Sequence, residues 1–201
     1  MHSARIAMIS VDFQEIEDLQ QRGLWEDSGK VLGTAAKQLD ATGADFLVIC
    51  TNTMHKVAHQ IEAAVCILLL HIADATAEAV EDRGISTIGL LGTRFTMEQD
   101  FYAGRLREKH GLSVLIPEEA DRTIVHNVIY NELVLGEVKE ASRSEFLRIM
   151  EAMKSDGAQG VILGCTEIGM LVGQSHTDIP LFDTALIHAS KAVEIALGQQ
   201  I

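Results

Sequence analysis

Two short apolar stretches of this chain each run directly into a cysteine–threonine pair, and this repeated pattern constrains the fold more than any other feature. Residues 46–49 lead into Cys50-Thr51-Asn52-Thr53, and residues 160–164 lead into Cys165-Thr166-Glu167. A short apolar run with β-branched residues, bounded by glycine and a polar cluster, is typical of a buried parallel strand. Because a helical pattern follows each polar cluster, we predict each cysteine at a turn between a strand and a helix.

The turn after a parallel strand is where open α/β sheets bind their ligands. Free backbone N–H groups at a helix start favour anions and lower the pKa of a thiol placed there. Thr and Asn side chains add hydroxyl and amide groups that suit a carboxylate. Each cysteine strand also follows an amphipathic helix that ends in Gly-Ala, at 43–44 and at 157–158. This repetition suggests an internal duplication with one thiol from each half.

The rest of the chain alternates strand and helix patterns, which implies parallel sheets. We expect an α/β fold of two pseudo-symmetric lobes that face each other, each a parallel sheet flanked by helices. The first lobe would comprise residues 1–86 plus 179–201, and the second residues 87–178. The predicted strands are 5–9, 46–49, 66–72, 87–91, 114–116, 160–164 and 180–182. The predicted helices are 25–42, 54–64, 74–81, one that starts at Thr96, 121–135, 139–156 and 184–197, and residues 12–22 are predicted as a loop with a helical turn.

Composition limits the functions open to this chain. Of its 201 residues, 47% are hydrophobic and only 4% aromatic, so the core is mostly aliphatic. The formal net charge of −13 argues against non-specific binding to nucleic acid or to anionic membranes, and an anionic substrate would need a locally positive site. Residues 1–10 do not resemble a secretory leader, and the longest apolar run, 63–70, is far short of the ~20 residues of a membrane span.

Cysteine usage points to a reducing compartment. Three cysteines do not make a disulfide framework, so we expect a cytoplasmic protein. No Cys/His spacing suggests a metal site. We interpret Cys66, which lies within an apolar run, as a small buried core residue.

Several stretches, in the same order along nearly the whole chain, resemble the aspartate/glutamate racemase superfamily. The resemblance is strongest to its aspartate racemase branch, which includes broad-specificity amino-acid racemases. The matching stretches are Ser10-Val11-Asp12-Phe13, Cys50-Thr51-Asn52-Thr53-Met54-His55, His71-Ile72-Ala73-Asp74-Ala75-Thr76, Leu91-Gly92-Thr93-Arg94-Phe95-Thr96-Met97-Glu98, Gly164-Cys165-Thr166-Glu167-Ile168-Gly169 and Phe182-Asp183-Thr184.

The resemblance implies a racemase that works without pyridoxal phosphate, metal or any other cofactor, and it implies a homodimer. Its two acid–base groups are two cysteines, which correspond here to Cys50 and Cys165. Family members typically begin with a further strand and a Gly-Gly-Met turn. Because no strand and glycine turn like 88–93 precedes Cys50, we expect that this chain lacks that segment.

Racemisation removes the α-proton from one face of the substrate and returns a proton to the other, which suits two opposed bases, one a thiolate and one a thiol. Backbone N–H groups beside the thiols would hold the carboxylate where negative charge grows. The candidate substrate-binding residues are Thr51, Asn52, Thr53, Thr93, Thr166, Glu167 and Lys139. The resemblance places Lys139 where aspartate racemases hold a substrate carboxylate, and Arg22 is a weaker candidate.

Most of these residues also have a purely structural interpretation. Thr93 could simply begin a helix, Lys139 could be a solvated helix residue, and Glu167 could cap a helix. Arg22 and Arg94 fit the surface better than a site. His55 and His188 could be polar partners near the cleft or purely structural residues, and Asp183 could cap the last helix.

The leading functional hypothesis is interconversion of L- and D-aspartate, or of a related acidic amino acid. The alternatives are a glutamate, hydantoin or broad-specificity racemase of the same superfamily and a homologue that binds without catalysis. Decarboxylase or cis–trans isomerase chemistry is less expected.

Overall fold

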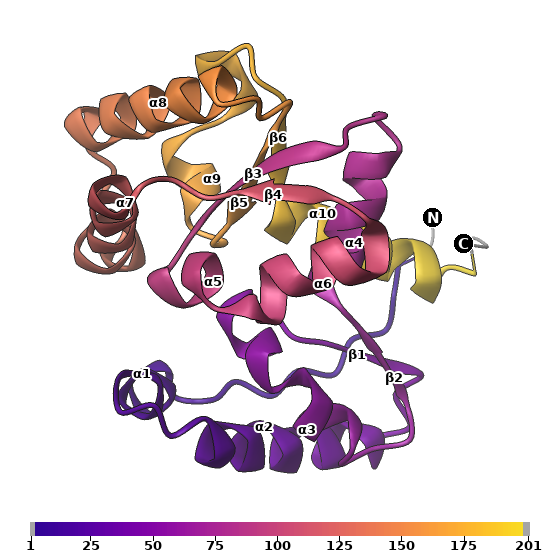
Figure 1. Cartoon of the computed structure of the whole chain (residues 1–201). Coiled ribbons are helices and arrows are strands. Elements are labelled where there is room, and N and C mark those ends of the chain that lie inside the picture. Colours follow the sequence, from indigo (N-terminus) through magenta and orange to yellow (C-terminus); the bar gives the residue numbers. More distant parts are fainter. Residues whose placement is uncertain (1–2, 199–201) are drawn as a thin grey trace. The chain divides into compact units, whose positions relative to one another are not determined.

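The computed structural model describes residues 3–198, so the outermost residues of the predicted first lobe, 1–2 and 199–201, lie outside the described part (Figure 1). By its contacts the chain divides into two units. Among the described residues, unit 1 comprises 3–49, 54–71 and 191–198, and unit 2 comprises 50–53 and 72–190. Residues 50–53, called the Cys50 turn below, therefore pack within the same unit as Cys165.

Unit 2 is built on a four-stranded parallel sheet. Its strands are β4 (Ser113–Leu115), β3 (Thr87–Gly92), β5 (Val161–Gly164) and β6 (Leu181–Asp183), in that order across the sheet. The register pairs Gly92 with Gly164 at the ends of β3 and β5. A Cβ at Gly164 would lie 2.8 Å from the carbonyl oxygen of Leu91, so only glycine permits this approach. Thr93 and Cys165, the next residues, therefore emerge side by side at one edge of the sheet.

Helices cover both faces of this sheet (Figure 1). On one face pack α7 (Glu119–Asn131), α8 (Glu140–Ser155) and α9 (Ile168–Leu171), and on the other α4 (Ile72–Glu81) and α6 (Asp100–His110). The strand side chains alternate between the faces, because successive residues of a strand point in opposite directions. Thus Val161 and Leu163 pack in the first core, and Ile162 packs in the second. The remaining elements of unit 2 are α5 (Arg94–Glu98), η2 (Leu133–Leu135), η3 (Gln174–His176) and the first part of α10 (Thr184–Ala196).

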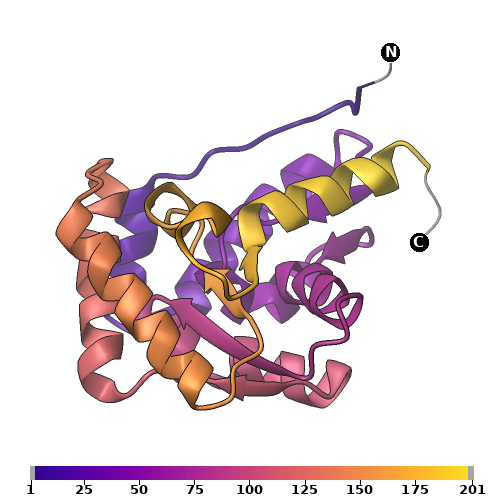
Figure 2. The same ribbon diagram turned by 90° about the horizontal axis from the view of Figure 1, so that it is seen from above.

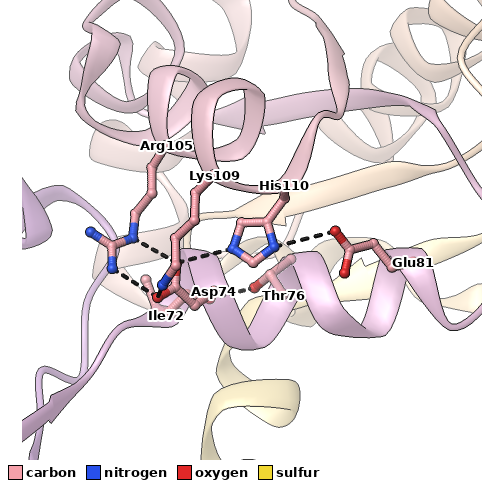
Figure 3. A network of polar contacts seen from close by, with 7 residues as sticks. All are labelled: Ile72, Asp74, Thr76, Glu81, Arg105, Lys109 and His110. Carbon is pink, nitrogen blue, oxygen red and sulfur yellow. Dashed lines mark hydrogen bonds and ion pairs between the residues drawn. The ribbon is translucent and has the colours of Figure 1, made fainter.

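A charged network joins α4 to α6 on the second face (Figure 3). Arg105 donates two hydrogen bonds to Asp74, at 2.6 and 2.7 Å, and Lys109 donates a third at 2.5 Å. The His110 ring lies between Asp74 and Glu81, at 3.2 and 3.3 Å. Burial by itself would raise the pKa of Asp74, but these hydrogen bonds outweigh it and hold the pKa well below its usual range.

Unit 1 contains a two-stranded parallel sheet of β1 (Phe46–Val48) and β2 (Leu68–Leu70). Around it are α1 (Phe13–Gln21), α2 (Trp25–Asp40) and α3 (Ala58–Glu62), with η1 (Thr53–Val57) leading into α3. Ile16, Leu47, Ile61 and Leu69 are among the buried residues of its aliphatic core. Each unit is therefore a parallel sheet flanked by helices, as predicted. In each sheet, the strand before a candidate catalytic cysteine pairs with the next strand along the chain: β1 with β2 before Cys50, and β5 with β6 before Cys165.

Four local predictions were wrong. Residues 3–12 form neither strand nor helix (Figure 2), and Ile6 and Met8 are 85% and 82% exposed. An apolar pattern becomes a strand only where a partner strand supplies hydrogen bonds. Residues 13–21 form a true helix, capped by Asp12, whose carboxylate accepts from the Gln14 N–H at 2.9 Å. Cys66 is exposed, and it lies two residues before the start of β2.

The fourth correction concerns the helix predicted to start at Thr96. That segment is instead two helices, α5 and α6, and Thr93 is the N-cap of the first. Its hydroxyl accepts from the Thr96 N–H at 3.4 Å. Sequence alone offered two threonines three residues apart, and either could serve as a cap.

The contact units also differ from the predicted lobes. The predicted first lobe contains α4 and β6, but both pack in unit 2, because β6 pairs with β5 and α4 covers a face of the same sheet. The division into lobes at residues 86 and 178 stays a prediction. Within residues 3–198, none of the helices is long and apolar enough to cross a membrane.

Candidate active site

The side chain of Thr53 holds the Cys50 turn to the rest of unit 2. The Thr53 hydroxyl lies 3.1 Å from that of Thr93 and 3.4 Å from that of Thr96, and the last two are 3.2 Å apart. All three threonines are buried. Two residues that the sequence singled out as candidates, Thr53 and Thr93, are thus brought into direct contact although 40 positions separate them. Thr96 completes the hydroxyl cluster and was not predicted as part of the site.

A second attachment runs from Asn52 to Thr184, the first residue of α10. The Asn52 amide nitrogen Nδ2 donates to the Thr184 hydroxyl at 2.9 Å, and that hydroxyl donates to the backbone carbonyl of Leu163 at 2.8 Å. The Asn52 oxygen Oδ1 is buried and has no hydrogen-bond partner among residues 3–198. A buried acceptor without a donor costs about 1–3 kcal/mol, so the site contains an unsatisfied group that a bound ligand could satisfy.

Cys165 has a different environment from Cys50. Its thiol donates to the Glu167 carboxylate oxygen Oε2 at 2.9 Å, and the Thr166 hydroxyl donates to the same oxygen at 2.8 Å. Cys50, in contrast, is exposed. Burial raises the pKa of the Cys165 thiol well above its ordinary value, and the charge and hydrogen bonding of Glu167 raise it further. Near neutral pH, Cys165 is therefore a neutral thiol.

The backbone groups of Thr166 and Glu167 do lower the pKa of this thiol, as expected for a helix start, but burial and the Glu167 carboxylate outweigh them. The helix after Cys165, α9, has only four residues, and the nearest charge to the thiol is a carboxylate. Glu167 occupies the N-cap position of α9, but its side chain makes no capping hydrogen bond. The structure thus favours the role of Glu167 as the partner of the thiol over its role as a helix cap.

Within residues 3–198, the ion pairs of Lys139 do not join it to either cysteine turn. Its ammonium group pairs with Glu137 at 2.8 Å and lies 3.6 Å from Glu132. The hydrogen bond to Glu137 is the main cause of a raised pKa. Lys139 is half-exposed, at the residue that precedes α8.

Other candidates have structural positions. Arg22 and Arg94 are exposed, as predicted. Asp183 caps α10, because its carboxylate oxygen Oδ1 accepts from the N–H groups of Ala185 and Leu186 at 3.0 and 3.1 Å. His55 packs against the ring of His71 in unit 1, with ring centroids 4.4 Å apart. Among residues 3–198, no group of three or more His, Cys, Asp or Glu side chains is placed to hold a metal ion.

Sequence reasoning missed Thr184 as a member of the site. The stretch Phe182-Asp183-Thr184 resembles the racemase superfamily, but the only role that the sequence suggests within it is a helix cap at Asp183. A threonine directly after a strand, at the start of a helix, is the same local pattern that singled out Thr93. That pattern does not reveal which distant amide its hydroxyl will meet.

Comparison with known proteins supports one family. The family model described as Asp/Glu/Hydantoin racemase matches residues 1–192. Among characterised proteins, the chain is 21% identical over 179 residues to the broad specificity amino-acid racemase RacX of Bacillus subtilis strain 168. That alignment covers 87% of this chain and 75% of RacX.

Solved structures agree with this result. A Yersinia pestis protein described as a candidate Asp/Glu racemase is 52% identical with a TM-score of 0.91, covering 98% of this chain and 86% of its own. An aspartate racemase homologue from Pyrococcus horikoshii OT3 is 35% identical with a TM-score of 0.82, and the match covers 95% of this chain and 83% of the homologue. The aspartate racemase of Picrophilus torridus, at 20% identity and a TM-score of 0.67 over 83% and 68% of the two chains, shares the fold.

Proposed function

Because the chain belongs to the Asp/Glu/hydantoin racemase family, we propose that it interconverts the L- and D-forms of aspartate, or of a related acidic amino acid, without a cofactor. Cys50 and Cys165 are the two acid–base groups in this proposal. The observation that carries it is the hydrogen-bonded connection between the two cysteine turns, in which Asn52 reaches Leu163 through Thr184. These partners lie within two residues of Cys50 and of Cys165.

The different environments of the two thiols support different starting roles. Cys165 begins as the proton donor, because burial and Glu167 raise the pKa of its thiol. The Cys50 thiolate removes the α-proton, and the bonding electron pair stays on Cα. The Cys165 S–H then delivers its proton to the opposite face of Cα, which inverts the configuration. Cys50 ends as a thiol and Cys165 as a thiolate, and proton exchange with water restores the starting state.

Reaction of the other enantiomer uses the same groups in reverse. The Cys165 thiolate takes the α-proton, and the Cys50 thiol returns one to the other face. A raised pKa makes the Cys165 thiolate a stronger base, which suits a weakly acidic C–H bond. The same raised pKa makes that thiolate scarce near neutral pH. Glu167 therefore has two opposed effects on the direction in which Cys165 is the base. It makes the Cys165 thiolate more basic, and it lowers the fraction of Cys165 that is thiolate.

Polar groups around the turns bind the rest of the substrate. The hydroxyls of Thr51, Thr53 and Thr93 are suitable donors to the α-carboxylate, where negative charge grows in the transition state. Thr166 can donate to it only by giving up its hydrogen bond to Glu167. The unsatisfied Oδ1 of Asn52 is an acceptor that a substrate ammonium group can use. Neither of these two interactions, with the α-carboxylate or with the ammonium group, places a charged protein group at Cα. Proton transfer at Cα is therefore left to the thiols.

The side-chain carboxylate of the substrate requires a cation, and Lys139 is the proposed one. To bind it, the ammonium group must exchange its contacts with Glu137 and Glu132 for the substrate. This pairing favours a second candidate function, a broad-specificity or glutamate- or hydantoin-type racemase, in which Lys139 keeps its present partners. The similarity to a broad specificity amino-acid racemase supports the same alternative. A homodimer and a cytoplasmic location stay predictions.

Incorporation of solvent deuterium at Cα tests the proposal directly. The purified protein is incubated in D2O with each enantiomer of aspartate, glutamate and a neutral amino acid, and both exchange and optical rotation are followed. Cys50→Ser and Cys165→Ser should each abolish inversion. Cys66→Ser is the matched control, because Cys66 is exposed and not part of the site, and it should behave as the parent.

Three results separate the alternatives. If both site variants invert substrate as fast as the parent, the two-thiol mechanism is wrong. If the parent binds acidic amino acids by calorimetry but exchanges no α-proton, the chain is a binding protein. If neutral amino acids are inverted as fast as aspartate, the broad-specificity alternative replaces the aspartate assignment.

A further inference from the structure

We propose that Thr184 is a positioning residue whose hydroxyl sets the placement of the two cysteine turns relative to each other. The inference rests on the proposed function, since it assigns Thr184 to the geometry of the two-thiol reaction. A single oxygen atom, Thr184 Oγ1, makes both hydrogen bonds of the connection, to Asn52 at 2.9 Å and to Leu163 at 2.8 Å. Thr184 itself does not act on the reacting atoms.

The direction of both hydrogen bonds follows from simple chemistry. A threonine hydroxyl has one proton to donate, and the Leu163 carbonyl can only accept, so that proton points to Leu163. The hydroxyl must then accept from Asn52, which requires the amide to present Nδ2 rather than Oδ1. Thr184 therefore fixes the orientation of the Asn52 amide and leaves Oδ1 as the free acceptor of the site.

The two partners of Thr184 lie close to the two sulfur atoms along the chain. Asn52 follows Cys50 by two residues, and Leu163 precedes Cys165 by two residues. Asn52, Leu163 and Thr184 are each at most 2% exposed, so water does not compete for these hydrogen bonds. The path from one cysteine to the other thus runs through a few buried covalent and hydrogen bonds.

Thr184 is itself held in place from its own side. It begins α10 directly after β6, which pairs with β5. Asp183 caps the helix, and its second carboxylate oxygen lies so close to Gly169 that a Cβ there would be 2.5 Å away. A rigid anchor of this kind is what a positioning group needs, because a displacement of about 1 Å can cost on the order of 100-fold in rate.

The Cys50 turn has another attachment, through Thr53 to Thr93 and Thr96. That attachment reaches the end of β3 rather than the strand of Cys165. Loss of the Thr184 hydroxyl should therefore leave the turn folded but free to shift with respect to Cys165. This distinction makes the proposal testable without unfolding the protein.

The test compares three variants in the D2O assay. Thr184→Val keeps the shape of the side chain but removes the hydroxyl, and Thr184→Ser keeps the hydroxyl. Thr76→Val is the matched control, because Thr76 is also fully buried and its hydroxyl also donates to a backbone carbonyl, that of Ile72 at 2.7 Å, away from the site. The readout is the ratio of inverted product to deuterium exchanged into recovered substrate.

We expect Thr184→Val to lower inversion by about 10- to 100-fold and to lower exchange much less. One displaced thiol can still remove and return a proton on its own face, whereas inversion needs both thiols in place. KM should change little and kcat should carry the loss. Thr184→Ser should restore most of the ratio, and Thr76→Val should leave it unchanged.

The proposal is overturned if Thr184→Val keeps the parent ratio, or if Thr184→Ser loses as much inversion as Thr184→Val. A second measurement in the Cys66→Ser background does not depend on activity: the rate at which a short bifunctional thiol reagent cross-links Cys50 to Cys165. Thr184→Val should change this rate several-fold, and Thr184→Ser should not. A parent that cross-links but does not racemise would refute the proposed function alone, and an unchanged rate in Thr184→Val would refute the role of Thr184 alone.

Discussion

The thiol of Cys165 donates a hydrogen bond to the carboxylate of Glu167, 2.9 Å away, and this contact adds to the effect of burial on the pKa of one of the two candidate acid–base groups. Burial and the Glu167 charge both raise the pKa of Cys165. Cys50 is exposed, and within residues 3–198 its thiol makes no hydrogen bond to a carboxylate. The two thiols of the proposed reaction are therefore not equivalent before substrate binds.

The first prediction concerns Glu167→Gln. Removal of the negative charge should lower the pKa of Cys165, so that its thiolate forms at lower pH. Alkylation of Cys165 by iodoacetamide, followed in a Cys50→Ser, Cys66→Ser background, should begin at lower pH than with Glu167 present. Glu151→Gln, at an exposed position on α8, is the control and should leave the alkylation profile in place. An unshifted profile in Glu167→Gln would mean that burial alone sets the pKa.

The second prediction concerns the pH dependence of stability through Asp74. Its pKa is lower in the folded state than its ordinary value of 3.8, so its contribution is present above about pH 4 and is lost as the pH falls further. Asp74→Asn should reduce the free energy of unfolding by about 2 kcal/mol at pH 7. It should also flatten the loss of stability below about pH 4. Urea unfolding at several pH values measures both effects.

Asp100→Asn provides the control for this network. Asp100 lies on α6 and pairs with Arg107, but its side chain is 72% exposed, and exposed ion pairs contribute about 0–1 kcal/mol. If Asp74→Asn costs no more than Asp100→Asn, the network in Figure 3 is not a source of stability. Racemisation by the folded protein should be unaffected in both variants, because neither aspartate contacts the cysteine turns.

The third prediction concerns Thr93, which is both a helix cap and a member of the hydroxyl cluster. Thr93→Val should lower the free energy of unfolding by about 1 kcal/mol, because α5 loses its cap. It should also reduce kcat/KM, because the Thr53 hydroxyl loses a partner 3.1 Å away. Thr93→Ser retains the hydroxyl and should recover both properties. Recovery of stability by serine without any recovery of kcat/KM would indicate that the methyl group, not the hydroxyl, matters for activity.

The fourth prediction separates the two substrate assignments through Lys139. If Lys139 binds the side-chain carboxylate of the substrate, Lys139→Ala should reduce kcat/KM for aspartate at least tenfold more than for a neutral amino acid, given the worth of a charged hydrogen bond. Lys154→Ala, at the far end of the helix that Lys139 precedes and also paired with a glutamate, should affect both substrates equally. Equal losses in Lys139→Ala would remove Lys139 from the site and favour the broad-specificity alternative.

Several elements of the fold were predictable because the signals that specify them are local. The strands before Cys50 and Cys165 follow from short apolar runs, and the helices α2, α4, α7, α8 and α10 follow from their periodicity and glycine boundaries. Residues 5–9 carry a similar apolar pattern and form no strand. Whether such a run becomes a strand depends on a partner elsewhere in the chain, and the run itself holds no information about that partner.

Local patterns and motifs were enough to predict that two cysteine–threonine turns follow parallel strands and that the chain is an α/β protein of one racemase family. Tertiary packing alone brings Thr53 to Thr93, buries Cys165 so that the pKa of its thiol is raised, and connects the two turns through Thr184. Asn52 and Thr184 are 132 positions apart. Secondary structure depends on side-chain patterns within a few residues, whereas a buried hydroxyl takes its partners from whichever elements the packed sheet brings to the same edge.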